Sequence, residues 1–167
     1  MMTVKEIFEM IKDDARYAKI LARNDAKDEA LDYLKAARRH ISAIMLYNLD
    51  GESIPKIEPA TKRQKQKYTY HHIWKADAFA VAMNKNCYGI DIEEGKEYTS
   101  KIVPWGILTI DDIKYPVYSD DPGQCDYIFI DGEHYSAGSY NFFPESTFLH
   151  GIVDHYFYEL EREIKGE

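Results

Sequence analysis

Two cysteines and six histidines are among the residues of this chain that could act as nucleophiles or general bases. A cysteine within about 3 Å of a histidine can be an activated nucleophile, and Cys125 and His134 are the nearest such pair along the sequence. If Asp131-Gly132 forms a two-residue hairpin turn, these two residues lie four ladder positions apart, roughly 13 Å at about 3.3 Å per residue. We therefore expect no dyad from this pair, and interpret Cys87 and Cys125 as buried, reduced thiols.

Asp131, His134 and Cys87 remain the catalytic candidates for a small hydrolase or nuclease-like enzyme, which would need them to converge in one cleft. His71 and His72 would point to opposite faces of a strand and could not act together. The sequence contains no phosphate-binding loop, dinucleotide fingerprint, HExxH, GxSxG or paired CxxC motif. An enzyme is therefore the second hypothesis rather than the first, and we expect no cofactor.

The C-terminal segment contains two pairs of side chains that could bind a metal ion. His150 and Asp154 lie at i and i+4 of a predicted helix, as do His155 and Glu159, and such a pair can bind a metal from one helix face. The two pairs point in different directions, because successive residues of a helix are rotated by about 100°. The sequence indicates no third ligand and no cysteine ligand set. We therefore predict no metal site, with His150 and Asp154 as the pair to test.

The charge distribution and the 14 tyrosines favour a binding role. The net charge is −8, and residues 71–167 alone hold 7 basic and 18 acidic side chains. Tyrosine supplies a large contact area with a polar tip. The segment 120–126 lacks the alternating oxygen ligands and closing Glu of a calcium loop. We predict instead an acidic, Tyr-rich binding surface made by Asp120, Asp121, Asp126, Glu133, Tyr135 and Tyr140.

A basic segment precedes this acidic region. It contains Lys62, Arg63, Lys65 and Lys67 and is followed by Tyr68 and Tyr70. Cations interleaved with aromatic rings are typical of nucleic-acid contacts, but the rest of the chain is acidic and would repel a polyanion. We interpret residues 62–67 as a solvated linker, and keep nucleic-acid binding through residues 62–70 as a third hypothesis.

Apolar residues at helical spacing predict three helices. The first follows a Thr3 cap and ends near Arg23, and the second begins after an Asn24-Asp25 cap and ends at Asp50-Gly51. Their short connection predicts an antiparallel αα-hairpin. Pro144 opens the third helix, which has the most regular amphipathic pattern of the chain.

The strands are predicted from β-branched and aromatic runs between turn residues. They are residues 68–74, 106–110, 113–118, 127–130 and 133–136, with 76–83 read as a strand although a short helix also fits. Asp121-Pro122-Gly123 should link two hairpins. Pro116 has no N–H for a ladder, so its strand is expected at an edge or a bulge. The fold class is α+β: an N-terminal αα-hairpin, an antiparallel β-sheet or meander, and a C-terminal amphipathic helix packed on the sheet.

The predicted organisation is a helical hairpin at 1–51, a linker at 52–67 and an α+β body at 68–167 that forms one compact unit with the hairpin. The low cysteine content and the polar N-terminal segment predict a cytoplasmic protein. The longest fully apolar run has six residues, whereas a membrane span needs about 20, so we predict no membrane insertion.

The leading hypothesis for function is a non-enzymatic protein that binds a basic protein partner through its acidic, Tyr-rich surface. Charge complementarity of this kind speeds association and weakens with salt. An inhibitor or accessory of a nucleic-acid-binding protein would fit this description. The aromatic surface could equally form a homodimer face, and the sequence alone names neither the partner nor the oligomeric state.

Overall fold

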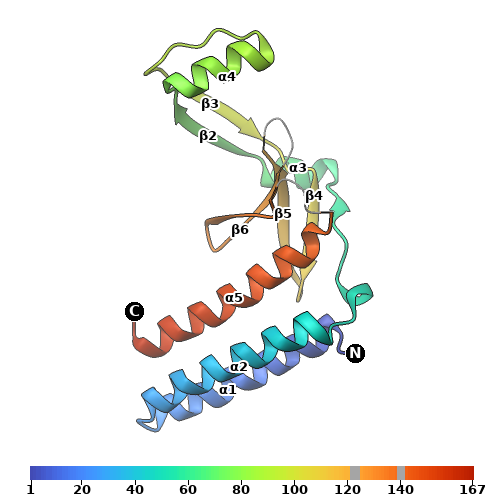
Figure 1. The fold of residues 1–167 in the computed structure, drawn as a ribbon, viewed down its shortest axis with the longest axis vertical. Coiled ribbons are helices and arrows are strands. Elements are labelled where there is room, and N and C mark those ends of the chain that lie inside the picture. The colour runs from blue at the N-terminus through green and yellow to red at the C-terminus, as the bar shows by residue number, and fades with distance from the viewer. Residues whose placement is uncertain (121–124, 139–141) are drawn as a thin grey trace. The chain divides into compact units, whose positions relative to one another are not determined.

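The computed structural model describes residues 1–120, 125–138 and 142–167, and the chain forms two compact units (Figure 1). One unit contains residues 1–59 and 106–167, and the other contains residues 60–105. This division differs from the predicted boundaries. Strand β1 (Glu58–Pro59) pairs with β4 (Gly106–Ile110), so the chain leaves and re-enters the first unit at neighbouring strands.

The predicted αα-hairpin is present as helix α1 (Val4–Arg23) and helix α2 (Lys27–Tyr47). The Thr3 hydroxyl accepts a hydrogen bond from the Glu6 N–H, as the sequence predicts. The predicted Asn24-Asp25 cap of the second helix is wrong, because Asn24 ends α1 and Ala26 directly precedes α2. The predicted end of the second helix at Asp50-Gly51 is also late, since Gly51 begins a separate 3₁₀ turn, η1 (Gly51–Ser53).

The first unit contains a five-stranded antiparallel sheet in the order β1-β4-β5-β6-β7, with β5 at Ile113–Ser119, β6 at Asp126–Ile130 and β7 at Glu133–Ser136. The predicted two-residue turn at Asp131-Gly132 is confirmed, and a second one lies between the predicted strands 106–110 and 113–118. Asp111 and Asp112 join β4 to β5, and Asp131 and Gly132 join β6 to β7, all four with positive φ. This backbone conformation matches the right-handed twist of the strands that the turns connect.

Pro116 lies in β5, which is an interior strand of the sheet order, whereas the sequence predicts an edge strand or a bulge for this residue. The ladder explains why proline is tolerated there. Pro116 pairs with Ile107 of β4, whereas β6 pairs only with Tyr118 and Ser119 at the end of β5. Pro116 therefore has a ladder on one side only, and the pair of Ile107 and Pro116 lies between hydrogen-bonded pairs of that ladder, so the proline removes no ladder hydrogen bond.

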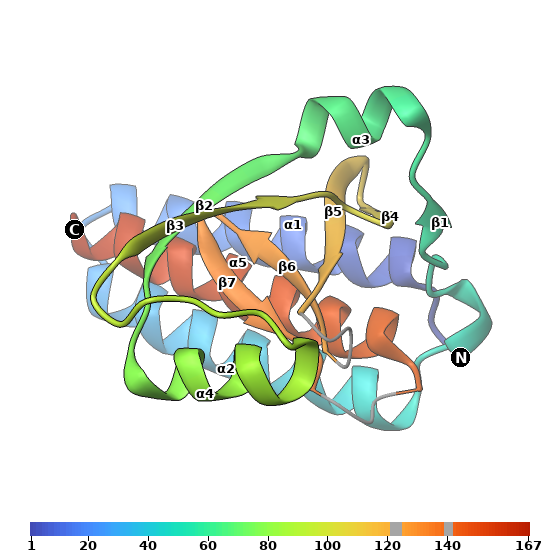
Figure 2. The same cartoon turned by 90° about the horizontal axis from the view of Figure 1, so that it is seen from above.

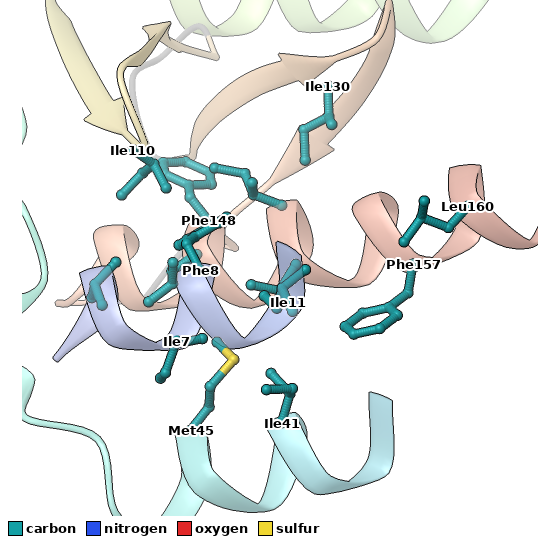
Figure 3. Close-up of a cluster of buried hydrophobic side chains, with 14 of the residues drawn as sticks. Ile7, Phe8, Ile11, Ile41, Met45, Ile110, Ile130, Phe148, Phe157 and Leu160 are labelled. Carbon is teal, nitrogen blue, oxygen red and sulfur yellow. The ribbon is translucent and has the colours of Figure 1, made fainter. Parts of the chain in front are cut away.

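Helix α5 (Pro144–Lys165) contacts α2 and the strands β6 and β7, and Figure 2 shows these two strands lying over it. Figure 3 shows Phe148 and Phe157 of α5 among apolar side chains of the helical hairpin and the sheet. Both phenylalanines are fully buried. The α+β class and the packing of the C-terminal helix on the sheet are therefore as predicted. No helix in the described part of the chain is both long and apolar enough to cross a bilayer.

The second unit contains helix α3 (Lys62–Tyr68), strand β2 (Tyr70–Lys75), helix α4 (Ala78–Tyr88) and strand β3 (Glu97–Ile102). The prediction of a strand at 76–83 is wrong, because this segment lies mostly in α4. Residues 62–67 form a helix rather than an irregular linker, since Thr61 and Gln64 make a reciprocal capping box. Strand β3, which the sequence analysis missed, pairs antiparallel with β2.

Candidate functional site

Three side chains that can donate to a metal converge between the β6–β7 turn and helix α5: Asp131, His155 and Glu159. His155 Nε2 lies 2.7 Å from Asp131 Oδ2 and 3.7 Å from Glu159 Oε1. The His155 side chain is only 13% exposed, whereas those of Asp131 and Glu159 are 72% and 44% exposed. The imidazole is therefore held at the protein surface with two carboxylates directed at one nitrogen.

Packing on both sides fixes this geometry. Ile130 precedes the turn and is buried in the core, while Ile152 and Val153 anchor the same stretch of α5 that carries His155. The hairpin approaches the helix closely at Gly151, where an added methyl group would lie 2.6 Å from Cζ of the Tyr135 ring. Glycine at this position lets β7 lie directly against α5. The turn is thereby placed beside the second half of the helix.

His155 separates two open hollows of the surface. The first, of about 340 Å³, is lined by Arg38, Ile130, Glu133, His134, Tyr135, Gly151, Asp154, His155 and Tyr158. The second, of about 330 Å³, contains Asp131, His155 and Glu159 together with the half-buried Tyr115. Burial raises the pKa of the Tyr115 phenol, and the nearby Asp131 and Asp111 raise it further. Tyr115 therefore stays protonated and can donate a hydrogen bond in this hollow.

The predicted catalytic candidates are not gathered in either hollow. His134 stacks on Tyr127 with ring centroids 4.2 Å apart and lines the first hollow, whereas Asp131 lines the second. The predicted register is confirmed, because His134 pairs with Phe129. Cys87 lies on α4 in the unit 60–105 and is exposed, so its interpretation as a buried thiol is wrong.

His150 and Asp154, the pair to test for a metal, differ from the second i, i+4 pair of the helix. Asp154 pairs with Arg38 at 3.2 Å, and the described residues supply no third ligand to His150 and Asp154. The second i, i+4 pair, His155 and Glu159, does gain a third donor. The sequence signal for this third donor is the position of Asp131 in a predicted tight turn. No sequence pattern shows which helix such a turn packs against.

The residues of the predicted acidic surface lie in different environments. Asp120 and Glu133 are exposed, and Asp126 accepts a 2.6 Å hydrogen bond from the Ser119 hydroxyl. Tyr135 is half-buried, packs edge-on against Phe148 and also lines the first hollow. Asp121, Tyr140 and the predicted turn at 121–123 lie outside the described residues.

The unit of residues 60–105 has two surface features, basic side chains on α3 and exposed apolar side chains. Lys62, Arg63, Lys65 and Lys67 are all exposed on α3, and the unit holds eight basic and five acidic side chains, a net charge of +3. It also exposes several large apolar side chains within its 46 residues. The large apolar side chains exposed there are Ile73, Phe79, Met83, Tyr88, Ile90, Val103 and Trp105.

Comparison of the chain with protein-family models, with curated protein sequences and with solved structures found no match.

Proposed function

We propose that this protein functions by binding another protein, and that helix α4 is the element that enters the partner. The observation that carries the proposal is an apolar stripe on a capped helix that buries none of its residues. Phe79, Ala82, Met83 and Cys87 follow one another at spacings of three, one and four residues, and all four are exposed. Such a stripe is the recognition surface of helices that dock into an apolar groove.

Hydrogen bonds at both ends of α4 stabilise this helix. The Asp77 side chain accepts a 2.7 Å hydrogen bond from the Ala80 N–H at the N-terminus. At the C-terminus Gly89 adopts φ 63°, and the N–H groups of Gly89 and Ile90 donate to the carbonyls of Lys85 and Asn84. These bonds satisfy two of the last carbonyls of the helix, and glycine favours the left-handed conformation that ends it. A preformed helix loses less conformational entropy on binding than a disordered segment would.

The surrounding unit supports the same interpretation. A two-stranded hairpin is marginally stable by itself in water, and the only fully buried apolar side chains in residues 60–105 are Ala76 and Pro104. Exposed apolar patches of natural proteins mark interaction sites, and three of the large exposed apolar side chains, Phe79, Met83 and Tyr88, lie on this one helix. Because the unit is basic, with Lys85 on the helix itself, the fitting partner is a protein whose apolar groove has an acidic rim.

Site-specific photo-cross-linking tests the proposal in the full-length protein. A photoreactive phenylalanine analogue replaces Phe79, which is 73% exposed, or Phe142 of the other unit, which is 88% exposed. In nuclease-treated lysate we expect one cross-linked protein from position 79 and none from the matched position 142. The captured protein is then purified for a direct affinity measurement.

The affinity measurement decides the outcome. Because truncation of an apolar anchor at the centre of an interface costs about 2 kcal/mol or more, the double variant Phe79→Ser, Met83→Ser should bind the captured protein at least about tenfold more weakly. Its melting temperature should not fall, since neither side chain is buried. Equal affinity of the variant and the wild type, or a cross-linked product containing two copies of this chain, would overturn the proposal.

A second candidate is the acidic surface predicted from the sequence. The unit of residues 1–59 and 106–167 holds 13 basic and 24 acidic side chains, a net charge of −11, and Asp120 and Glu133 are exposed on it. A basic protein partner would bind there with a rate that falls as salt rises. The double variant Asp120→Asn, Glu133→Gln should slow association at low salt, whereas an unchanged association rate contradicts this candidate.

A further inference from the structure

We infer that Asp131, His155 and Glu159 bind a divalent transition-metal ion of the zinc class. The three donor atoms lie within 4.8 Å of one another. Asp131 and His155 are 24 residues apart in the sequence, so the site joins a turn to a helix that follows much later in the chain. His155 and Glu159 occupy consecutive turns of α5, and Asp131 faces them from the β6–β7 turn. Helix α4, the element proposed above for protein binding, contributes none of these three residues.

The distances suit a metal with short bonds. Nitrogen and oxygen ligands bind zinc at about 2.0–2.2 Å, which places neighbouring donor atoms of a tetrahedral site about 3.3 Å apart. The measured separations of 2.7 Å and 3.7 Å from His155 Nε2 lie on either side of this value. The two carboxylates are on exposed side chains, so small rotations about their side-chain bonds complete the geometry.

The donor set selects the class of ion. Calcium and magnesium take oxygen ligands, whereas an imidazole with two carboxylates suits zinc, cobalt and related ions. Three protein ligands leave a fourth tetrahedral position, which is open to water or to a small anionic ligand. The hollow beside this position contains the protonated Tyr115 and several apolar side chains.

Two interactions in the structure compete with metal binding for the proposed ligands. Arg162 Nη1 lies 3.4 Å from Glu159 Oε1, and the Asp131–His155 contact is itself a good hydrogen bond. Without an ion, Asp131 and His155 therefore form a latch, by which we mean a hydrogen bond that joins the turn to the helix. A latch needs only the contact between Asp131 and His155, whereas metal binding needs all three donors, and this difference makes the two roles separable.

Metal titration of the whole 167-residue chain distinguishes metal binding from the latch. After treatment with a chelator, Zn²⁺ is added in a calorimeter, and Co²⁺ is added while its visible d–d absorption is recorded. We expect one ion per chain with a nitrogen-and-oxygen tetrahedral spectrum, and a melting temperature that rises with Zn²⁺ concentration. The variants are His155→Ala and Glu159→Gln, and the matched control is His150→Ala, which removes a half-buried histidine from the same helix.

The expected result is at least tenfold weaker Zn²⁺ binding by both site variants and unchanged binding by the control. Glu159→Gln keeps the Asp131–His155 contact, so it tests the ion even if His155→Ala disturbs the fold. A wild-type protein that binds no ion in the micromolar range would overturn the inference. So would Glu159→Gln binding Zn²⁺ as tightly as the wild type, which would assign the cluster to the latch alone.

Discussion

Replacing Gly151 by alanine should have opposite effects in the presence and absence of the Tyr135 ring. Gly151 lies inside helix α5, where alanine is favoured over glycine by about 1 kcal/mol. The added methyl group would lie 2.6, 2.7 and 3.0 Å from three carbon atoms of the Tyr135 ring, closer than packed atoms approach. Overpacking of this kind costs about 1–3 kcal/mol. In the wild-type background, Gly151→Ala should therefore lower the free energy of unfolding by about 0–2 kcal/mol.

In a Tyr135→Ala background the steric cost disappears and the helix preference remains. Gly151→Ala should then raise the free energy of unfolding by about 1 kcal/mol, which corresponds to a coupling of about 1–3 kcal/mol between the two positions. Urea unfolding of the four proteins, followed by far-ultraviolet circular dichroism, gives each free energy.

The control is Tyr135→Phe, which keeps the ring and removes only a long hydrogen bond, 3.5 Å, from the Tyr135 hydroxyl to the Thr147 carbonyl. Gly151→Ala should be as unfavourable in that background as in the wild type. If Gly151→Ala changes stability by the same amount with and without the ring, within about 0.5 kcal/mol, then β7 does not rest on α5 in the way described.

Two further predictions concern the core and the pH dependence. Phe157→Ala should lower the free energy of unfolding, measured in urea, by about 3–5 kcal/mol because the Phe157 ring is fully buried. The control Phe142→Ala, at an exposed position, should change this free energy by less than about 0.5 kcal/mol. Similar losses for the two variants would contradict the placement of Phe157 in the core. The hydrogen bond from Tyr33 to Asp14, 2.7 Å long, raises the pKa of Tyr33 to about 12. Since an unfolded tyrosine has a pKa near 10, stability should fall between pH 10 and 12 more steeply for the wild type than for Tyr33→Phe, and parallel pH profiles would exclude this contact.

The sequence alone determined most elements of the first unit. The helices α1, α2 and α5 follow from apolar residues at helical spacing, and the turns at Asp111-Asp112 and Asp131-Gly132 follow from residue types that accept positive φ. These signals are local, so they need no knowledge of what packs where. The pattern failed at 76–83, because a run of small apolar residues has no polar positions from which to read a period.

Only the tertiary structure decided the sites. His155 and Glu159 are visible in the sequence as an i, i+4 pair, but Asp131 joins them only because Tyr135 rests on Gly151 and Ile130 enters the core. The exposed stripe of α4 was equally hidden, since an apolar helix in a sequence is expected to be buried. Which apolar face is covered depends on contacts between residues far apart in the chain, and these follow from packing rather than from local preference.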